Sequence, residues 1–146
     1  MQSISVDQVR SEVFKFWSAF EGKTRSTFEE QYSPTAGVFA VDGRRSEPAR
    51  LMWVRRDREF FGPHSSVRAR LGTITVQLLG VNLAVAAYPL QFSVVRTLPN
   101  GKRVGVDIPF CRATQVFQID EKGKLLIIHE HLSSAEPVAP KELPPQ

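Results

Sequence analysis

Apolar residues near the start of the chain recur at intervals of three and four. They are Val6, Val9, Val13, Phe16, Trp17 and Phe20. This spacing places them on one stripe of an amphipathic helix, which Ser3 or Ser5 can cap and which Gly22 can end. A shorter second helix is predicted over residues 24–32, because Phe28 and Tyr32 are four residues apart, and Pro34 ends it by disfavouring helix in the residue before it. The two helices should form an αα-hairpin.

The pattern changes to that of a strand after this hairpin. An apolar run over residues 38–41 predicts a short strand that ends in an Asp-Gly turn. The Ser-Glu-Pro sequence at residues 46–48 then predicts the start of a third helix. Trp53 is one of the apolar positions of this helix, and the Gly-Pro pair at residues 62–63 ends it.

The remaining chain predicts an antiparallel meander. Partly alternating, β-branched segments cover residues 67–79, 83–95, 104–120 and 125–133. The pair Asn100 and Gly101 is a strong hairpin signal, and Pro109 is expected at a bulge or an edge because proline cannot donate to the ladder. The predicted fold class is α+β, with three helices packed in the concave face of a strongly bent antiparallel sheet, a cone-shaped α+β barrel.

Length and composition fit one domain. With 146 residues, the chain is predicted to form a single α+β cone domain over residues 1–134, followed by a flexible tail over residues 135–146. Four prolines in those twelve residues predict an extended and poorly ordered end, either a peptide handle or a frayed terminus.

Several classes of protein are excluded or disfavoured. Cys111 is the single cysteine, so neither an intrachain disulfide nor a zinc ribbon is possible. No apolar run reaches the roughly 18 residues of a membrane span, and the N-terminus does not resemble an export signal, so we expect a cytoplasmic protein with no membrane partner. Residues 44–70 hold eight arginines against three acids. These arginines fall on several faces rather than one stripe, which disfavours nucleic-acid binding.

The order of the predicted elements and the end of the last strand together resemble a known family. That strand reads Ile-Ile-His-Glu-His-Leu-Ser-Ser over residues 127–134, and it is preceded by Arg-Ala-Thr-Gln-Val-Phe over residues 112–117 and by a Lys-Gly-Lys turn. The chain resembles the SnoaL-like branch of the nuclear-transport-factor-2-like superfamily, close to the association domain of calcium/calmodulin-dependent kinase II. The resemblance implies a cone fold that serves isomerases, dehydratases, polyketide cyclases and non-catalytic oligomerising modules. By this resemblance, the places of the arginines that line the pocket of the kinase domain are taken here by Gln115 and Leu132.

The last predicted strand carries an acid among apolar residues. Alternation places on one face Leu126, Ile128, Glu130 and Leu132. If this face lines the cone, desolvation raises the pKa of Glu130 toward the range of a general acid or base, and Glu130 is the catalytic candidate. The alternative is an ion pair of Glu130 with Arg112 or with a neighbouring subunit.

The other face of the same strand carries His129 and His131. They become the alternative acid/base candidates if that face lines the cone instead. Two histidines at this spacing need further ligands to bind a metal, and no matching motif accompanies them, so we predict no metal. No glycine-rich phosphate loop is present, and we predict no cofactor. Apolar residues on both faces of the strand predict a homodimer through the long strands.

Five residues are predicted to line a pocket for a small molecule in the cone: Trp53, Tyr88, Gln115, Phe117 and Leu132. Gln115 should neighbour Glu130 and orient the ligand, and Tyr88 can supply a hydroxyl. Two functions remain open at this point. One is a ligand-binding and dimerising module; the other is an enzyme of the isomerase, dehydratase or polyketide-cyclase type, in which Glu130 moves a proton on a carbonyl-bearing ring substrate.

Overall fold

The computed structural model of the chain describes residues 3–22, 29–40, 45–52, 65–134 and 141–144. Its elements are α1 (Val6–Glu21), β1 (Tyr32–Phe39), β2 (Glu47–Pro48), β3 (Ser65–Leu71), β4 (Thr75–Leu78), β5 (Leu83–Thr97), β6 (Arg103–Ile119), β7 (Leu125–Ser134) and β8 (Lys141–Glu142). Residues 29–30 and 49–52 are also helical. The expected Asp-Gly turn, Trp53 and the Gly-Pro stop lie outside the described residues.

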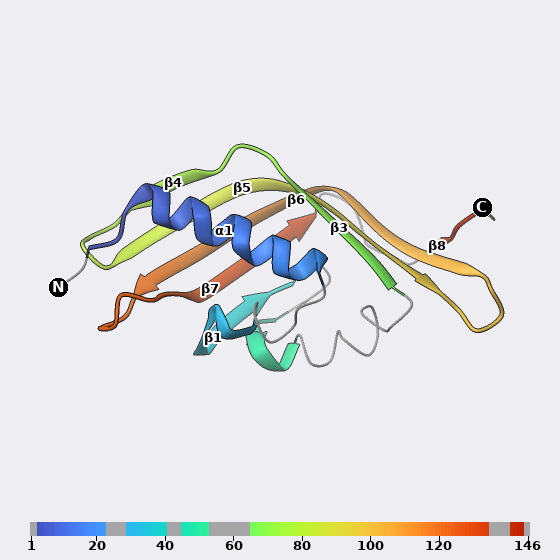
Figure 1. Cartoon of the computed structure of the whole chain (residues 1–146), viewed down its shortest axis with the longest axis horizontal. Helices are drawn as coiled ribbons and strands as arrows, with labels where there is room; N and C mark the ends of the chain where they lie inside the picture. The colour runs from blue at the N-terminus through green and yellow to red at the C-terminus, as the bar shows by residue number, and fades with distance from the viewer. Residues whose placement is uncertain (1–2, 23–28, 41–44, 53–64, 135–140, 145–146) are drawn as a thin grey trace.

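One strongly curved sheet contains all the described strands, and α1 lies across it (Figure 1). The order is β2-β1-β7-β6-β5-β3, with β4 also paired to β5 and β8 to β6. Every pairing is antiparallel except that of β1 with β7, which is parallel. The sheet does not close. The predicted α+β class, with a bent sheet around a helical face, is confirmed.

The first helix forms as its sequence predicts. Ser5 and Gln8 make a reciprocal capping box at its start, and Gly22 ends it by donating its N–H to the carbonyl oxygen of Ser18 at 3.0 Å. The apolar stripe faces the sheet and is buried at Val9, Val13, Phe16, Trp17, Ala19 and Phe20. This stripe forms one wall of the core, and the other wall is the concave face of the sheet.

The first strand begins earlier than expected. Tyr32 was assigned to a second helix, but it is the first residue of β1 and pairs with Ile127 of β7. The register of this pairing shifts between Tyr32 and Gly37, a stretch that includes Pro34. Proline is tolerated where the ladder is interrupted, because no strand partner there requires its missing N–H. The expected strand start at Val38 was therefore six residues too late.

Two other predicted boundaries were wrong. Glu47–Pro48 forms β2 against β1, so the helical residues that follow begin at Ala49 rather than in the expected Ser-Glu-Pro turn. The single strand predicted over residues 67–79 is divided into β3 and β4. Gly72 lies in the break and donates its N–H to the carbonyl oxygen of Pro89 at 2.9 Å. A Cβ on Gly72 would overlap the ring of Pro89, so only glycine permits this close crossing.

The meander of long strands otherwise follows the prediction. The hairpin between β5 and β6 has Gly101 at φ +82°, a conformation that glycine adopts without strain. The ladder between these strands shifts register where Leu90 pairs with Cys111 and Phe92 pairs with Ile108. Pro109 lies in this bulge, as predicted.

Part of the C-terminal tail lies against the sheet. The two residues of β8 pair with β6, and Leu143 donates its N–H to the carbonyl oxygen of Arg103 at 2.8 Å. The side chain of Leu143 packs closely over Gly105, so closely that a Cβ on that glycine would lie 3.1 Å from it. Lys141, Glu142 and Leu143 are thus in contact with β6.

None of the helices in the described part of the chain is both long enough and apolar enough to cross a membrane.

Candidate functional site

A bulge in β7 decides which of its side chains point toward α1. Val116 pairs with His129 and Phe117 pairs with Ile127, so Ile128 is an extra residue in the ladder. The alternation changes phase there. Leu125 and Ile127, rather than Leu126 and Ile128, share the interior face with Glu130 and Leu132. The predicted placement of Leu126 and Ile128 was wrong, because a single bulge leaves no mark on the alternating pattern.

Glu130 lies at the centre of this interior face. Its side chain has no exposed surface, and both carboxylate oxygens accept a hydrogen bond. The hydroxyl of Tyr32 donates to Oε1 at 2.7 Å, and Nε2 of Gln115 donates to Oε2 at 2.5 Å. Gln115 is the cross-strand partner of Glu130 in the ladder between β6 and β7, so the sheet itself positions this contact.

The hydrogen bonds continue from Gln115 to α1. Its Oε1 accepts from the hydroxyl of Tyr88 at 2.7 Å, and the oxygen of Tyr88 accepts from Nε1 of Trp17 at 2.7 Å. Five buried polar groups on α1, β1, β5, β6 and β7 thus form one connected network, which we call the Glu130 network: Trp17, Tyr32, Tyr88, Gln115 and Glu130. When the donors and acceptors of a buried network all have partners, one arrangement of its side chains is favoured.

Burial changes the acidity of the network. It raises the pKa of Glu130 to about 7, although the hydrogen bonds from Tyr32 and Gln115 oppose this rise by stabilising the carboxylate. Burial, and next the nearby charge of Glu130, raise the pKa of Tyr88 well above its usual value, so Tyr88 remains a hydrogen-bond donor at neutral pH. A carboxyl group with a pKa near 7 can both take up and release a proton under physiological conditions.

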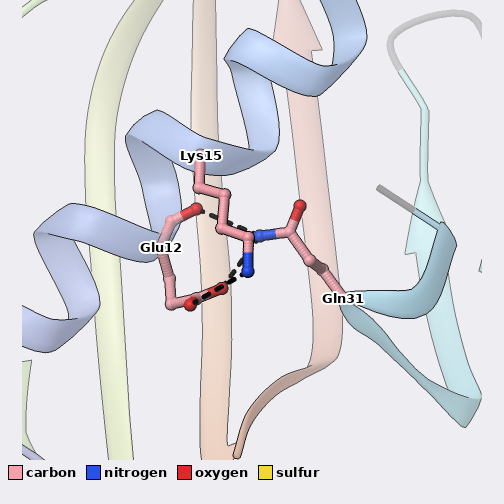
Figure 2. Close-up of polar contacts among 3 residues, drawn as sticks. All are labelled: Glu12, Lys15 and Gln31. Atoms are coloured by element: carbon pink, nitrogen blue, oxygen red, sulfur yellow. Dashed lines mark hydrogen bonds and ion pairs between the residues drawn. The ribbon is translucent and has the colours of Figure 1, made fainter. Parts of the chain in front are cut away.

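Gln31 fixes the start of β1, and with it Tyr32. Figure 2 shows the side chain of Gln31 reaching α1, where Nε2 donates to the carbonyl oxygen of Glu12 at 3.3 Å and to its Oε2 at 2.9 Å. Lys15 lies 4.0 Å from the other carboxylate oxygen of Glu12. The backbone carbonyl of Gln31 accepts from the N–H of Ile127 at 2.7 Å. Gln31 therefore connects α1, β1 and β7 immediately before Tyr32.

The other predicted site residues lie in different surroundings. Phe117 and Leu132 are buried in the interior face, with Phe117 1% exposed. Trp53 lies outside the described residues. Arg112 is exposed, and the described contacts of the Glu130 carboxylate are with Tyr32 and Gln115, so the alternative of an ion pair within the chain is not formed.

His129 and His131 lie on the opposite side of β7 from Glu130. Their rings pack near that of Phe39, with centroids 6.2 Å and 5.7 Å from it. His131 is exposed and His129 is half-buried. In the part of the chain that the structure describes, no three His, Cys, Asp or Glu side chains gather as metal ligands.

One small hollow on the outside of the molecule reaches the Glu130 network. Its volume is about 140 Å³, and its lining residues are Phe14, Trp17, Ser18, Glu21, Ala69 and Leu71. It touches the network at Trp17 only. Glu130 itself has no exposed surface and does not line this hollow.

Comparison with solved structures identifies the fold. The sequence matches no protein-family model and is not significantly similar to any curated protein. Similar structures include a candidate dehydratase of the nuclear-transport-factor-2-like family from Streptomyces avermitilis, with 17% identity, a TM-score of 0.71 and coverage of 90% of this chain and 97% of that one. The chain has the nuclear-transport-factor-2-like fold.

Two more solved structures have this nuclear-transport-factor-2-like architecture. A candidate calcium/calmodulin-dependent protein kinase II association domain from Xanthomonas campestris has 20% identity and a TM-score of 0.66, covering 92% of this chain and 94% of that one. A nuclear-transport-factor-2-like protein of unknown function from Pseudomonas putida has 18% identity and a TM-score of 0.66, covering 87% and 84%. The resemblance drawn from the sequence is confirmed at the level of the fold.

Sequence reasoning missed two members of the Glu130 network. Trp17 was assigned to core packing, and Tyr32 was placed on a helix. The signal that could have found them is chemical: a buried Trp N–H or Tyr O–H needs a hydrogen-bond partner. Glu130 and Gln115, expected on an interior face, are the partners that such donors require.

Proposed function

We propose that the protein binds a small, mostly apolar, carbonyl-bearing molecule in its cone and moves a proton on it through Glu130. The observation that carries this proposal is the fully buried carboxylate of Glu130, held by the hydroxyl of Tyr32 and the amide of Gln115. Apolar side chains surround these groups, as they do in sites that bind small organic molecules.

The chemistry suits an isomerisation or a dehydration. The carboxylate of Glu130 takes a proton from the carbon next to the carbonyl, which leaves an enolate, and the carboxylic acid then returns that proton to another carbon or to a leaving hydroxyl. The hydroxyl of Tyr32 is a donor that can stabilise the enolate oxygen. A pKa of about 7 for Glu130 suits both steps at neutral pH. The candidate dehydratase among the structures of similar fold supports this reaction class.

A second candidate function is binding without chemistry, in a protein that also forms a homodimer. The observation that favours it is the complete enclosure of Glu130, because a substrate reaches the carboxylate only after a neighbouring side chain moves. The candidate kinase association domain among the similar structures is consistent with an assembly role.

The two functions are separated by turnover of a probe ketone. We would follow the isomerisation of a cyclic β,γ-unsaturated ketone to its conjugated isomer by absorbance, with wild type and Glu130→Gln. Glu130→Gln preserves the shape of the side chain and removes the base, so kcat/KM should fall by about 10²–10⁴-fold. Because the base must be ionised, kcat/KM of the wild type should rise with pH and level off above about pH 7.

Asp107→Asn is the matched control, since Asp107 is an exposed acid on β6. Its turnover should equal that of wild type. Equal turnover by wild type and Glu130→Gln would contradict the catalytic proposal. Binding of the probe to both proteins with no turnover would instead support the binding module.

A further inference from the structure

The hydrogen bonds of the Glu130 network can run in only one direction, and Trp17 sets that direction. An indole N–H donates and cannot accept. The oxygen of Tyr88 therefore accepts from Trp17, and the hydroxyl proton of Tyr88 must point to its other partner, Oε1 of Gln115, 2.7 Å away. This contact identifies that atom of Gln115 as the carbonyl oxygen, so the amide NH₂ must face Glu130.

The fixed amide makes the two oxygens of Glu130 unequal. Oε2 faces an N–H donor of Gln115 at 2.5 Å, and a proton on Oε2 would oppose that donor. Oε1 faces the hydroxyl of Tyr32 at 2.7 Å. A hydroxyl can rotate to accept as well as donate, so Oε1 can carry a proton without losing its partner.

We infer that Trp17 is a positioning residue, which acts through Tyr88 and Gln115 to keep Oε2 of Glu130 an acceptor and to confine the exchangeable proton of Glu130 to Oε1, beside Tyr32. In the proposed reaction, to which this inference adds, the proton then leaves and returns on the Tyr32 side of the carboxyl group. The direction of the hydrogen bonds does not depend on whether the protein is an enzyme.

The opposite arrangement is blocked while Trp17 is present. If the amide of Gln115 reversed, its NH₂ would face the oxygen of Tyr88, which already accepts from Trp17. The hydroxyl proton of Tyr88 would then have no acceptor and would lie beside two N–H donors, those of Trp17 and Gln115. An unpaired donor is costly in a buried site. Removing the indole N–H leaves the oxygen of Tyr88 free to accept a hydrogen bond from another donor. The amide can then reverse and accept a proton from the neutral form of Glu130.

Few titratable groups face Glu130 in the described part of the chain. They are Tyr32 on β1, Tyr88 on β5 and the thiol of Cys111 on β6. Burial raises the pKa of Cys111 to about 11, so the thiol is neutral near pH 7. The guanidinium of Arg50 binds the backbone carbonyl of Tyr32 at 2.8 Å and is exposed to solvent. A change in the titration of Glu130 on substitution of Trp17 therefore reports the hydrogen-bond network.

The test is a titration of Glu130 in Trp17→Phe. The side-chain carboxyl carbon of Glu130 would be followed by ¹³C NMR against pH and assigned by its replacement in Glu130→Gln. We expect the pKa of Glu130 to rise by about 1 above that of wild type, because the neutral carboxyl group gains an acceptor. A role for Trp17 in packing alone would admit water and lower the pKa of Glu130 or leave it unchanged, and either result would overturn the inference.

Tyr88→Phe cuts the same chain one step closer to Gln115 and is the second variant. It should raise the pKa of Glu130 similarly, and Trp17→Phe should add nothing to it, because the indole then has no oxygen to bind. Additive shifts in the double variant would also contradict the inference. The titration needs no substrate. Its result therefore tests this inference even if the turnover experiment finds no activity.

Discussion

At the scale of single residues, Glu130 combines burial with a titratable group, and this has a cost in stability. Its pKa is about 7 in the folded chain and 4.5 in the reference state. Between these values the folded protein holds a proton that the unfolded chain releases. The stability that this proton confers is therefore fully present below pH 4.5 and is lost as the pH rises through 7.

Glu130→Gln should remove this dependence. A glutamine can accept from Gln115 through its oxygen and donate to Tyr32, so it can replace the neutral carboxyl group in the network. The free energy of unfolding of the variant, relative to wild type, should increase by about 3 kcal/mol from pH 4.5 to pH 8. Urea unfolding at both pH values measures this difference.

Leu132→Val is the control, since it alters packing on the same interior face of β7 without a titratable group. Its effect on the free energy of unfolding should be equal at the two pH values. A relative stability of Glu130→Gln that does not change with pH would show that Glu130 titrates normally.

Some residues of the site could be predicted from the sequence, and others could not. Glu130 could be placed on an interior strand face with Leu132, because both residues follow the bulge of β7 and the alternation between them is regular, and Gln115 lies directly across the ladder from Glu130. Tyr32 could not be placed, because Pro34 imitates a helix stop and the pairing of β1 with β7 is a long-range contact. The role of Trp17 depends on how close α1 lies to β5. A local sequence pattern cannot predict that distance.

At the scale of elements, local patterns predict what local chemistry determines. The serine cap of α1, the glycine hairpin and the proline bulge could all be predicted from the sequence. The bulge at Ile128 and the break at Gly72 were not, because each depends on the strand that lies beside it. The docking of β8 likewise depends on β6, since two residues and one leucine show no periodic pattern.

Deleting residues 141–146 should therefore lower the stability of the protein. The deletion removes the pairing of β8 and the contact of Leu143 with Gly105, with an expected loss of about 1–2 kcal/mol and a melting temperature lower by several degrees. Calorimetry of the shortened chain measures the loss. Lys141→Ala, at an exposed position of β8, should change the free energy of unfolding by less than about 0.5 kcal/mol. A shortened chain as stable as the full one would show that the tail does not dock in solution.

At the scale of the whole molecule, the sheet has two different faces. The concave face is covered by α1 and encloses the Glu130 network. The other face carries partly exposed apolar and imidazole side chains near its centre: Phe39, Val85, Val116, Leu126, Ile128 and His129. The order of the expected elements was sufficient to predict the curved α+β sheet, since three amphipathic helices and a long meander have few ways to bury their apolar surfaces.

The unlike faces of the sheet lead to a prediction about assembly. A second copy is the partner we expect on the outer face, because the same apolar face on two identical chains can be self-complementary. Sedimentation at micromolar concentration should give about twice the mass of the 16.4 kDa chain.

Two substitutions test which surface forms the dimer. Val116→Glu places a charge at the centre of this face and should shift the protein to monomer. Leu79→Glu, at a half-exposed leucine beyond the end of β4, should leave the dimer intact. A wild-type protein that sediments as a monomer at this concentration would exclude the interface, and dissociation by both substitutions would place it elsewhere. In either case the Glu130 network would be complete within one chain, because all five of its residues belong to the same copy.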